Sequence, residues 1–323
     1  MSRQEQPGMD DLRAMKRHQR VDKILEIRAA KAKKTKRTQT ADLPETDSLV
    51  ISVGPGVCTI AVDGAPEQRL VHTDLTVAPG DRVAIRHEKV AAIAPRRTTL
   101  SRTDPVNPRR ERIIAANIDT LVIVAATADP PFRPGLVDRY LVAATRGGIQ
   151  PILCVTKIDL DPDTRAAETY REAGVPVIRC STATNTGIYE LRDLLAGNLA
   201  VLAGHSGVGK SSLLNALTRE ATARTGSVSA ETGKGTHTTT SSRLYELKNG
   251  ARIIDTPGIR MFEPGVVTYE QLFAAFPEFA EFPCRFRDCH HRNEPGCGVI
   301  SAVESAQIQH GRYASYLKLS ASV

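Results

Sequence analysis

The sequence predicts a multidomain α/β protein with a small N-terminal β-barrel, a central parallel sheet and a C-terminal helical module. Short strands separated by Gly and Pro crowd the region after Ser48, and continuous apolar strands alternate with helices further along the chain. A chain of 323 residues is also long for a single core. We expect four parts: a basic disordered arm (1–47), an OB-type barrel with its connector (48–110), an α/β domain (111–261) and a helical module (262–323).

The positive charge of the chain lies near its N-terminus. Residues 1–40 contain 12 Lys or Arg and 5 Asp or Glu, so they carry the whole formal net charge of +7. Such an arm suits RNA, because counterion release drives the binding of polyphosphates, although a solvated tail without a partner is the alternative. The chain shows no apolar signal-peptide core and no membrane-length apolar stretch. We therefore expect a cytosolic protein with no membrane partner, in which Cys58, Cys154 and Cys180 are core thiols.

The barrel is predicted from short apolar segments at 49–53, 57–62, 82–85 and 90–93. A Gly-Pro-Gly turn separates the first two, and Asp63-Gly64 is typical of a hairpin turn. An OB-type barrel fits this pattern best, and another small barrel or sandwich without a nucleic-acid role is the alternative. The Pro- and Arg-rich residues 95–112 are interpreted as a connector.

The central domain is predicted from apolar strands at 121–126, 151–155, 175–179 and 199–203, with helices at 135–146 and from Lys210. Uninterrupted apolar strands of this kind belong to parallel sheets that helices cover on both faces. A hairpin through Asn249-Gly250, with strands 244–247 and 252–254, is expected at the edge of the sheet.

A phosphate-binding loop follows the strand 199–203 and precedes an amphipathic helix. Its glycines let backbone N–H groups surround phosphate oxygens, Lys210 can reach the β and γ phosphates, and the Ser211 hydroxyl can bind Mg²⁺. This context disfavours the alternative of a Gly-rich turn without a ligand. The residues predicted to contact the nucleotide here are Gly204, His205, Ser206, Gly207, Val208, Gly209, Lys210, Ser211 and Ser212.

Two further segments are expected near the γ phosphate. Asp255 ends an apolar strand, so its carboxylate can reach Mg²⁺ through water, while the Gly258 N–H can contact the γ phosphate. The Gly-rich segment 233–240 offers a threonine hydroxyl that completes the Mg²⁺ shell only when the γ phosphate is present. Thr239 is favoured over Thr238, and a plain Ser/Thr-rich surface loop is the alternative.

The segment Thr156-Lys157-Ile158-Asp159 predicts that the base is guanine. The Asp159 carboxylate can accept hydrogen bonds from the ring N–H and the amino group of guanine, donors that adenine lacks at those positions. Ser181 and Thr182 end the next strand, where a backbone N–H can donate to the guanine oxygen. The expected ligands are therefore GTP or GDP with Mg²⁺. In common GTPases the guanine-reading motif follows the phosphate-binding loop, whereas here it precedes the loop.

Three cysteines, Cys284, Cys289 and Cys297, lie close together with the adjacent His290 and His291. Cysteines this close in a cytosolic chain predict one closed structural Zn²⁺ site rather than free thiols, but spacing does not choose between the two histidines. The metal would supply folding free energy to a segment that is poor in apolar residues.

In this order, the motifs at 156–159, 204–211, 233–239 and 255–258, with the Cys/His cluster, resemble the ribosome small-subunit-dependent GTPase A family over about residues 48–310. The resemblance implies an OB-type barrel, a circularly permuted P-loop GTPase domain and a C-terminal helical zinc-binding domain. It also implies GTP hydrolysis stimulated by the small ribosomal subunit, a role in the late maturation of that subunit, contact with its rRNA, and a monomer. It favours His291 as the fourth zinc ligand. Thr156 departs from the family, which has Asn there.

The catalytic group differs from the one that Ras-like enzymes use. Ile259 stands where Ras-like enzymes place a water-orienting Gln, and its side chain cannot polarise water, so slow intrinsic turnover is expected. His237 is the predicted replacement, and the resemblance supports this choice. Lys210 and Thr239 are the other predicted catalytic residues. A loop-positioning role for His237 is the alternative. Two other functions stay open: an RNA-binding module with a degenerate nucleotide site, and a GTPase of large-subunit assembly.

Overall fold

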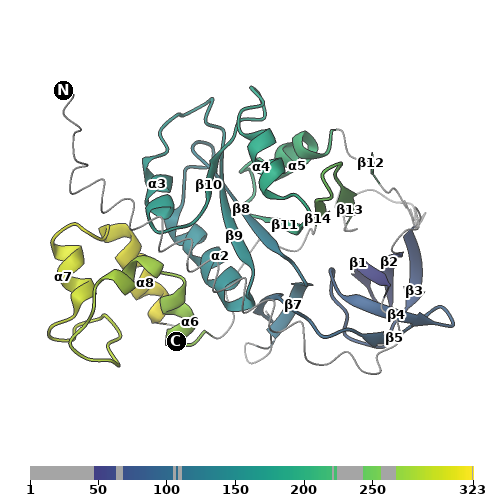
Figure 1. Ribbon diagram of the computed structural model, residues 1–323, viewed down its shortest axis with the longest axis horizontal. Coiled ribbons are helices and arrows are strands. Elements are labelled where there is room, and N and C mark those ends of the chain that lie inside the picture. The colour runs from purple at the N-terminus through teal and green to yellow at the C-terminus, as the bar shows by residue number, and fades with distance from the viewer. Residues whose placement is uncertain are drawn as a thin grey trace, which may run out of the picture. The chain divides into compact units, whose positions relative to one another are not determined.

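The computed structural model in Figure 1 describes residues 47–62, 68–104, 107, 111–219, 222–223, 243–255, 267–321 and 323. Several predictions lie outside these residues: the basic arm up to residue 46, the hairpin signal Asp63-Gly64, and His237, Thr238, Thr239, Gly258 and Ile259. None of the helices in the described part of the chain has the length and apolar character needed to span a bilayer.

The predicted barrel is present. Its strands are β1 (Ser48–Gly54), β2 (Val57–Val62), β3 (Gln68–His72), β4 (Arg82–Arg86) and β5 (Lys89–Ile93). They close in the order β1-β2-β3-β5-β4, with β4 pairing back to β1, which makes a five-stranded barrel of the OB type. Val50, Ile60 and Val83 fill its interior. Only β3 was missed by the sequence analysis, because its polar residues leave most of the strand exposed or half-buried.

The segment interpreted as a connector contains two strands. β6 (Thr99–Thr103) and β7 (Glu111–Ala116) pair antiparallel as a separate two-stranded ribbon. Of the two prolines that suggested a connector, Pro95 precedes β6 and so removes no ladder hydrogen bond, and Pro108 lies outside the described residues.

The central sheet has seven strands in the order β10-β9-β8-β11-β14-β13-β12. The strands are β8 (Thr120–Ala126), β9 (Gln150–Thr156), β10 (Val177–Arg179), β11 (Leu199–Ala203), β12 (Thr222–Ala223), β13 (Arg243–Glu246) and β14 (Arg252–Asp255). From β10 to β14 the strands run parallel, and β13 pairs antiparallel with β14. The predicted hairpin is therefore correct, but the two-residue β12 lies outside it in the sheet.

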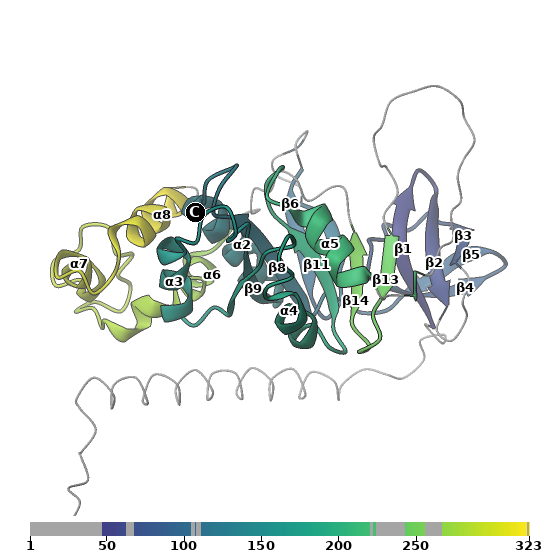
Figure 2. The same ribbon diagram turned by 90° about the horizontal axis from the view of Figure 1, so that it is seen from above.

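Helices cover both faces of this sheet, as Figures 1 and 2 show. The helices are α2 (Pro134–Gly147), α3 (Arg165–Glu172), α4 (Ile188–Leu194) and α5 (Lys210–Thr218). Successive residues of a strand face opposite sides, so Leu121 and Ile123 of β8 pack with α2 and α3, whereas Val122 and Val124 pack with α4 and α5. This explains why the strands are apolar without alternation.

The C-terminal module consists of short helices around an aromatic core. Its elements are α6 (Tyr269–Ala274), the 3₁₀ helix η2 (Pro277–Glu281), α7 (Gly298–Glu304) and α8 (His310–Ser320). Phe276, Phe279 and Tyr316 are fully buried and their rings lie 5.1–5.4 Å apart, centroid to centroid. Val142 of α2 belongs to the same apolar cluster, so this module packs against α2.

Candidate nucleotide and metal sites

The predicted nucleotide-binding segments emerge at one edge of the sheet. β9, β8, β11 and β14 are parallel neighbours, and the register pairs Ala126 with Thr156 and Ile123 with Ala203. The carboxyl ends of these strands therefore lie side by side, where open α/β sheets bind ligands. Asp255 is exposed at the end of β14, next to the strand that leads into the phosphate-binding loop.

The guanine-reading segment and the phosphate-binding loop are in direct contact. The buried Thr156 donates its hydroxyl hydrogen to the Val208 carbonyl at 2.6 Å, and the Ala125 carbonyl lies 3.1 Å from the same oxygen. The hydroxyl has one hydrogen, and the shorter distance assigns it to Val208. Two segments that are 52 residues apart in the chain thus adjoin, which the permuted order of the motifs requires.

The glycines of the phosphate-binding loop have the conformations that make them necessary. Gly204, Gly207 and Gly209 have φ angles of 150°, 82° and 90°. A Cβ on Gly204 would lie 2.2 Å from the Val124 carbonyl oxygen, so no larger residue fits without moving the loop. No side chain caps the start of α5 after Gly209, and an uncapped helix N-terminus favours an anion.

Lys210 and the serines that follow it begin α5. The Lys210 ammonium donates to the carbonyls of Gly204 at 2.8 Å and His205 at 2.6 Å, so it lies along the loop. Ser211 and Ser212 are exposed in the first turn of the helix. This is the side of the helix start where a phosphate with its Mg²⁺ would be bound.

In the guanine-reading segment, Asp159 is exposed within a turn after β9. Lys157 adopts a left-handed φ of 61° and donates to the Asp129 carbonyl in the loop after β8. In the next loop the Ser181 N–H already donates to the Thr186 carbonyl at 3.1 Å. A hydrogen bond to a guanine oxygen is therefore better assigned to the adjacent Thr182 N–H than to Ser181.

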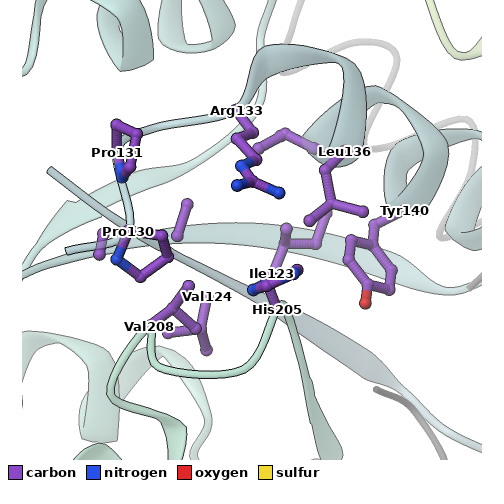
Figure 3. Close-up of a pocket in the computed structure, with 12 residues that line it drawn as sticks. Ile123, Val124, Pro130, Pro131, Arg133, Leu136, Tyr140, His205 and Val208 are labelled. Atoms are coloured by element: carbon purple, nitrogen blue, oxygen red, sulfur yellow. The ribbon is translucent and has the colours of Figure 1, made fainter. Parts of the chain in front are cut away.

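A cleft that is open to solvent lies beside the phosphate-binding loop (Figure 3). Figure 3 shows Pro130 and Pro131 from the loop after β8, Tyr140 from α2, and His205 and Val208 from the phosphate-binding loop around this cleft. Burial raises the pKa of Tyr140 to about 12, and a hydrogen bond with the Gly204 backbone offsets part of the rise. The helix α2 therefore lies directly behind the loop that is predicted to hold the phosphates.

The loop after β8, which supplies Asp129 and the prolines of the cleft, was not predicted from the sequence. It carries no recognisable motif. The signal that would have found it is its position, because it follows a buried strand whose carboxyl end lies between those of β9 and β11.

The four residues predicted to bind zinc lie together. The ligand atoms of Cys284, Cys289, His291 and Cys297 all lie within 4.8 Å of one another. The His291 Nδ1 atom is 3.3, 3.6 and 3.4 Å from the three Sγ atoms, and the Sγ atoms of Cys284 and Cys297 are 3.7 Å apart. Zinc bond lengths predict edges of about 3.6 Å (N–S) and about 3.8 Å (S–S) for a tetrahedral site. The donor set and its dimensions therefore fit Zn²⁺.

The structure also chooses between the two histidines. His291 is buried and faces the sulfur atoms, whereas His290 stacks on Tyr269 with ring centroids 3.8 Å apart. Partial burial by itself would raise the pKa of the Cys284 thiol, but the Val299 and Gly298 N–H groups at the start of α7 lower it. A lowered thiol pKa favours the thiolate that a metal binds.

Glu294 organises the loop between the zinc-ligand candidates. Its carboxylate accepts hydrogen bonds from the N–H groups of His290 at 2.8 Å, Arg292 at 2.8 Å and Asn293 at 3.1 Å. Although desolvation opposes the shift, these N–H groups lower the pKa of Glu294 to about 2. Sequence reasoning missed Glu294, because a lone glutamate in a polar loop carries no pattern.

The family model for the RsgA GTPase matches residues 93–264 of the chain. The small ribosomal subunit biogenesis GTPase RsgA of Pseudomonas putida is 39% identical over 329 residues, covering 94% of this chain and 95% of that protein. The chain belongs to the RsgA GTPase family. The protein of the same name from Chlorobaculum parvum is 40% identical over 290 residues, covering 87% of this chain and 92% of that protein.

Two solved structures share the fold of this family member. The crystal structure of YjeQ from Thermotoga maritima matches with a TM-score of 0.64 and 29% identity, covering 84% of this chain and 96% of that one. YloQ, described as a circularly permuted GTPase, matches with a TM-score of 0.62 and 27% identity, covering 86% of this chain and 96% of that one. The chain is thus a GTPase with an OB-type barrel, a permuted GTPase domain and a C-terminal Cys/His cluster.

Proposed function

We propose that this GTPase binds the small ribosomal subunit and acts in its late maturation, hydrolysing GTP to GDP and phosphate with stimulation by the subunit. The names of the relatives from Pseudomonas putida and Chlorobaculum parvum support the choice of subunit. The observation that carries the nucleotide chemistry is the contact between Thr156 and Val208, because it brings the guanine-reading segment to the phosphate-binding loop.

Each part of the nucleotide has a proposed set of contacts. Asp159 reads guanine, with the Thr182 N–H on the guanine oxygen. The N–H groups of 204–211 and Lys210 hold the β and γ phosphates. Ser211 and Thr239 bind Mg²⁺ directly, Asp255 binds it through water, and Gly258 contacts the γ phosphate. When bound, Mg²⁺ neutralises charge that develops on the phosphate oxygens.

The catalytic assignment to His237 rests on sequence alone. We expect His237→Ala to keep GTP affinity within about twofold of wild type and to lose the stimulated hydrolysis, because a general base or water-orienting group contributes about 10²–10⁴-fold. Single-turnover GTP hydrolysis with saturating small subunits measures this effect. Unchanged stimulated hydrolysis in this variant would remove His237 from the mechanism.

The zinc-binding segment and the basic arm are the proposed RNA contacts. Arg285, Arg287 and Arg292 are exposed residues of the segment that contains the Cys/His cluster, and residues 1–40 carry the net positive charge. One Zn²⁺ held by Cys284, Cys289, His291 and Cys297 would fix the fold of this segment. We propose that the affinity for the subunit depends on the bound nucleotide and that the protein acts as a monomer in the cytoplasm.

GTPase activity with and without isolated small subunits tests the proposed function. We expect small subunits to raise turnover at least tenfold, large subunits to have no such effect, and Lys210→Ala to abolish the activity in both cases. Stimulation by large subunits alone would favour a role in large-subunit assembly. GTP titrations of wild type that match those of Lys210→Ala would indicate a degenerate nucleotide site.

A further inference from the structure

A buried ion pair joins the C-terminal module to the GTPase domain. Arg312 of α8 is 4% exposed and pairs with Asp138 of α2, which is fully buried. The same guanidinium makes two hydrogen bonds, of 2.7 and 3.1 Å, to the Glu278 carboxylate of η2. One cation is thus held between a carboxylate of its own module and a carboxylate of the GTPase domain.

Aromatic rings complete the surroundings of this guanidinium. Its Cζ atom lies 4.3 Å from the ring centroid of Phe276 and 4.9 Å from that of Tyr170. Tyr170 belongs to α3, and its hydroxyl donates to the Pro134 carbonyl at the start of α2, at 3.1 Å. Arg312 therefore contacts both α2 and α3 as well as its own module (Figure 2 shows α8 beside these two helices).

These two helices support the proposed nucleotide contacts. The face of α2 that carries Leu136 and Tyr140 lines the cleft beside His205 and Val208 of the phosphate-binding loop. Helix α3 follows the turn that contains Asp159, the residue proposed to read guanine. A shift of Arg312 would therefore act on α2, which lies beside the phosphate-binding loop, and on α3, which follows the guanine-reading turn.

Helix α8 also holds the zinc-binding segment, through two tyrosines close to Arg312. The Tyr313 hydroxyl donates to the His291 carbonyl at 2.8 Å, and the Tyr316 hydroxyl donates to the His290 carbonyl at 3.0 Å. Arg312 and Tyr313 are consecutive residues of one helix. The zinc-binding loop, α8 and α2 thus form a continuous chain of hydrogen bonds and packed side chains.

Charge makes this connection different from an apolar contact. A buried guanidinium separated from its carboxylates would leave charges without water or partners. The ion pair therefore fixes the position of α8 on α2. We propose that Arg312, through Asp138, is the positioning residue by which the zinc-binding module and the phosphate-binding loop affect each other, a proposal that rests on the proposed function.

The coupling is measured as a ratio of affinities. The affinity of the full-length protein for small subunits is measured once with a bound non-hydrolysable GTP analogue and once with bound GDP. For wild type we expect the two affinities to differ by a factor of about 5–150, the usual range of allosteric coupling. Asp138→Asn keeps the shape of the side chain and leaves Arg312 paired with Glu278, so the variant is expected to fold. The ratio should fall at least threefold in Asp138→Asn and to about 1 in Asp138→Asn/Arg312→Met.

The matched control is Arg146→Met on the same helix. Arg146 pairs with Glu111 of the β6–β7 ribbon and not with α8, so this variant should keep the wild-type ratio. Zinc content and GDP affinity within twofold of wild type verify that each variant is folded. A folded Asp138→Asn protein with the wild-type ratio, or the same loss of ratio in Arg146→Met, would overturn the proposal.

A second readout does not involve the ribosome. The zinc affinity of the protein, measured by competition with a chelator, should differ between the GTP analogue and GDP in wild type and should not differ in the double variant, because coupling is reciprocal. Failure of wild type to bind small subunits would contradict the proposed function. The nucleotide dependence of the zinc affinity would then be the remaining test of the role of Arg312. A zinc affinity independent of nucleotide in wild type would overturn the coupling itself.

Discussion

The phosphate-binding loop and the Cys/His cluster are two sites built in different ways. The phosphate-binding loop is formed mainly by backbone groups. Gly204 lies close to the Val124 carbonyl of a buried strand, and the Val208 carbonyl accepts a hydrogen bond from Thr156. The cluster is made of side chains on irregular segments, where Cys284 and Cys289 are only partly buried. The packed strands of the sheet support the first site, whereas we propose that the second needs Zn²⁺ to hold its chain segments together.

This difference predicts which property a substitution in each region will affect. In the cluster, substitutions act on metal binding and, through it, on the fold of the C-terminal module. In the loop, they act on the packing of the central sheet and on the nucleotide at the same time.

The largest effect is expected from a zinc ligand. Cys297→Ser should lose the metal and with it most of the stability of the C-terminal module, because structural zinc supplies about 10–16 kcal/mol of binding free energy in small domains. Metal content and a thermal melt followed by near-UV circular dichroism measure this. Cys58→Ala, which changes a buried thiol in the barrel, is the control and should keep one zinc per chain. A fully metallated Cys297→Ser protein would break the contrast between the two sites.

Glu294→Gln tests the support of the zinc-binding loop. The Glu294 carboxylate accepts hydrogen bonds from three backbone N–H groups, and a neutral amide is a weaker acceptor. We therefore expect the zinc affinity to fall about 10- to 100-fold, as for other groups that orient metal ligands. Chelator competition at neutral pH gives the affinity. Glu304→Gln on the exposed side of α7 should leave it unchanged. Equal losses in the two variants would show that only net charge matters.

Gly204→Ala tests whether the phosphate-binding loop is limited by packing. The added methyl group meets the Val124 carbonyl, so the protein should lose about 1–3 kcal/mol of stability even without nucleotide. Urea denaturation of the nucleotide-free protein measures the loss. Gly311→Ala, where nothing lies within 4 Å of the new methyl group, should be neutral or slightly stabilising. A Gly204→Ala protein of normal stability that binds GTP normally would disprove the packing constraint.

The smallest effect is expected at Thr156. Thr156→Val removes the hydrogen bond to Val208 and should cost about 0.5–1.5 kcal/mol and speed GDP release. Thr156→Ser keeps the hydroxyl and should behave like wild type. Release of a fluorescent GDP in stopped flow compares the variants. Identical release rates in all three proteins would mean that this hydroxyl does not hold the loop in place.

The elements and residues of this chain that were predicted, and those that were missed, divide along the same line. Strands β1, β2, β8 and β11 were predicted within one or two residues, because apolar runs bounded by Gly and Pro are local signals. The polar strand β3 and the ribbon strands β6 and β7 were missed, since their hydrogen bonds depend on partners elsewhere in the chain. Glu294, Asp138 and Arg312 were missed for the same reason: each is a single charged residue whose role depends on what surrounds it.

The sequence by itself determined the chemistry of the sites. It fixes the positions of the glycines, the lysine, the carboxylates and the thiols, and the order in which they occur. Covalent spacing within a short segment fixes such groups relative to one another, as in 204–211. Only the tertiary structure decided that Thr156 meets Val208, that His291 and not His290 faces the sulfur atoms, and that Arg312 reaches Asp138. These contacts join segments or orient side chains through packing, and packing is a property of the folded chain as a whole.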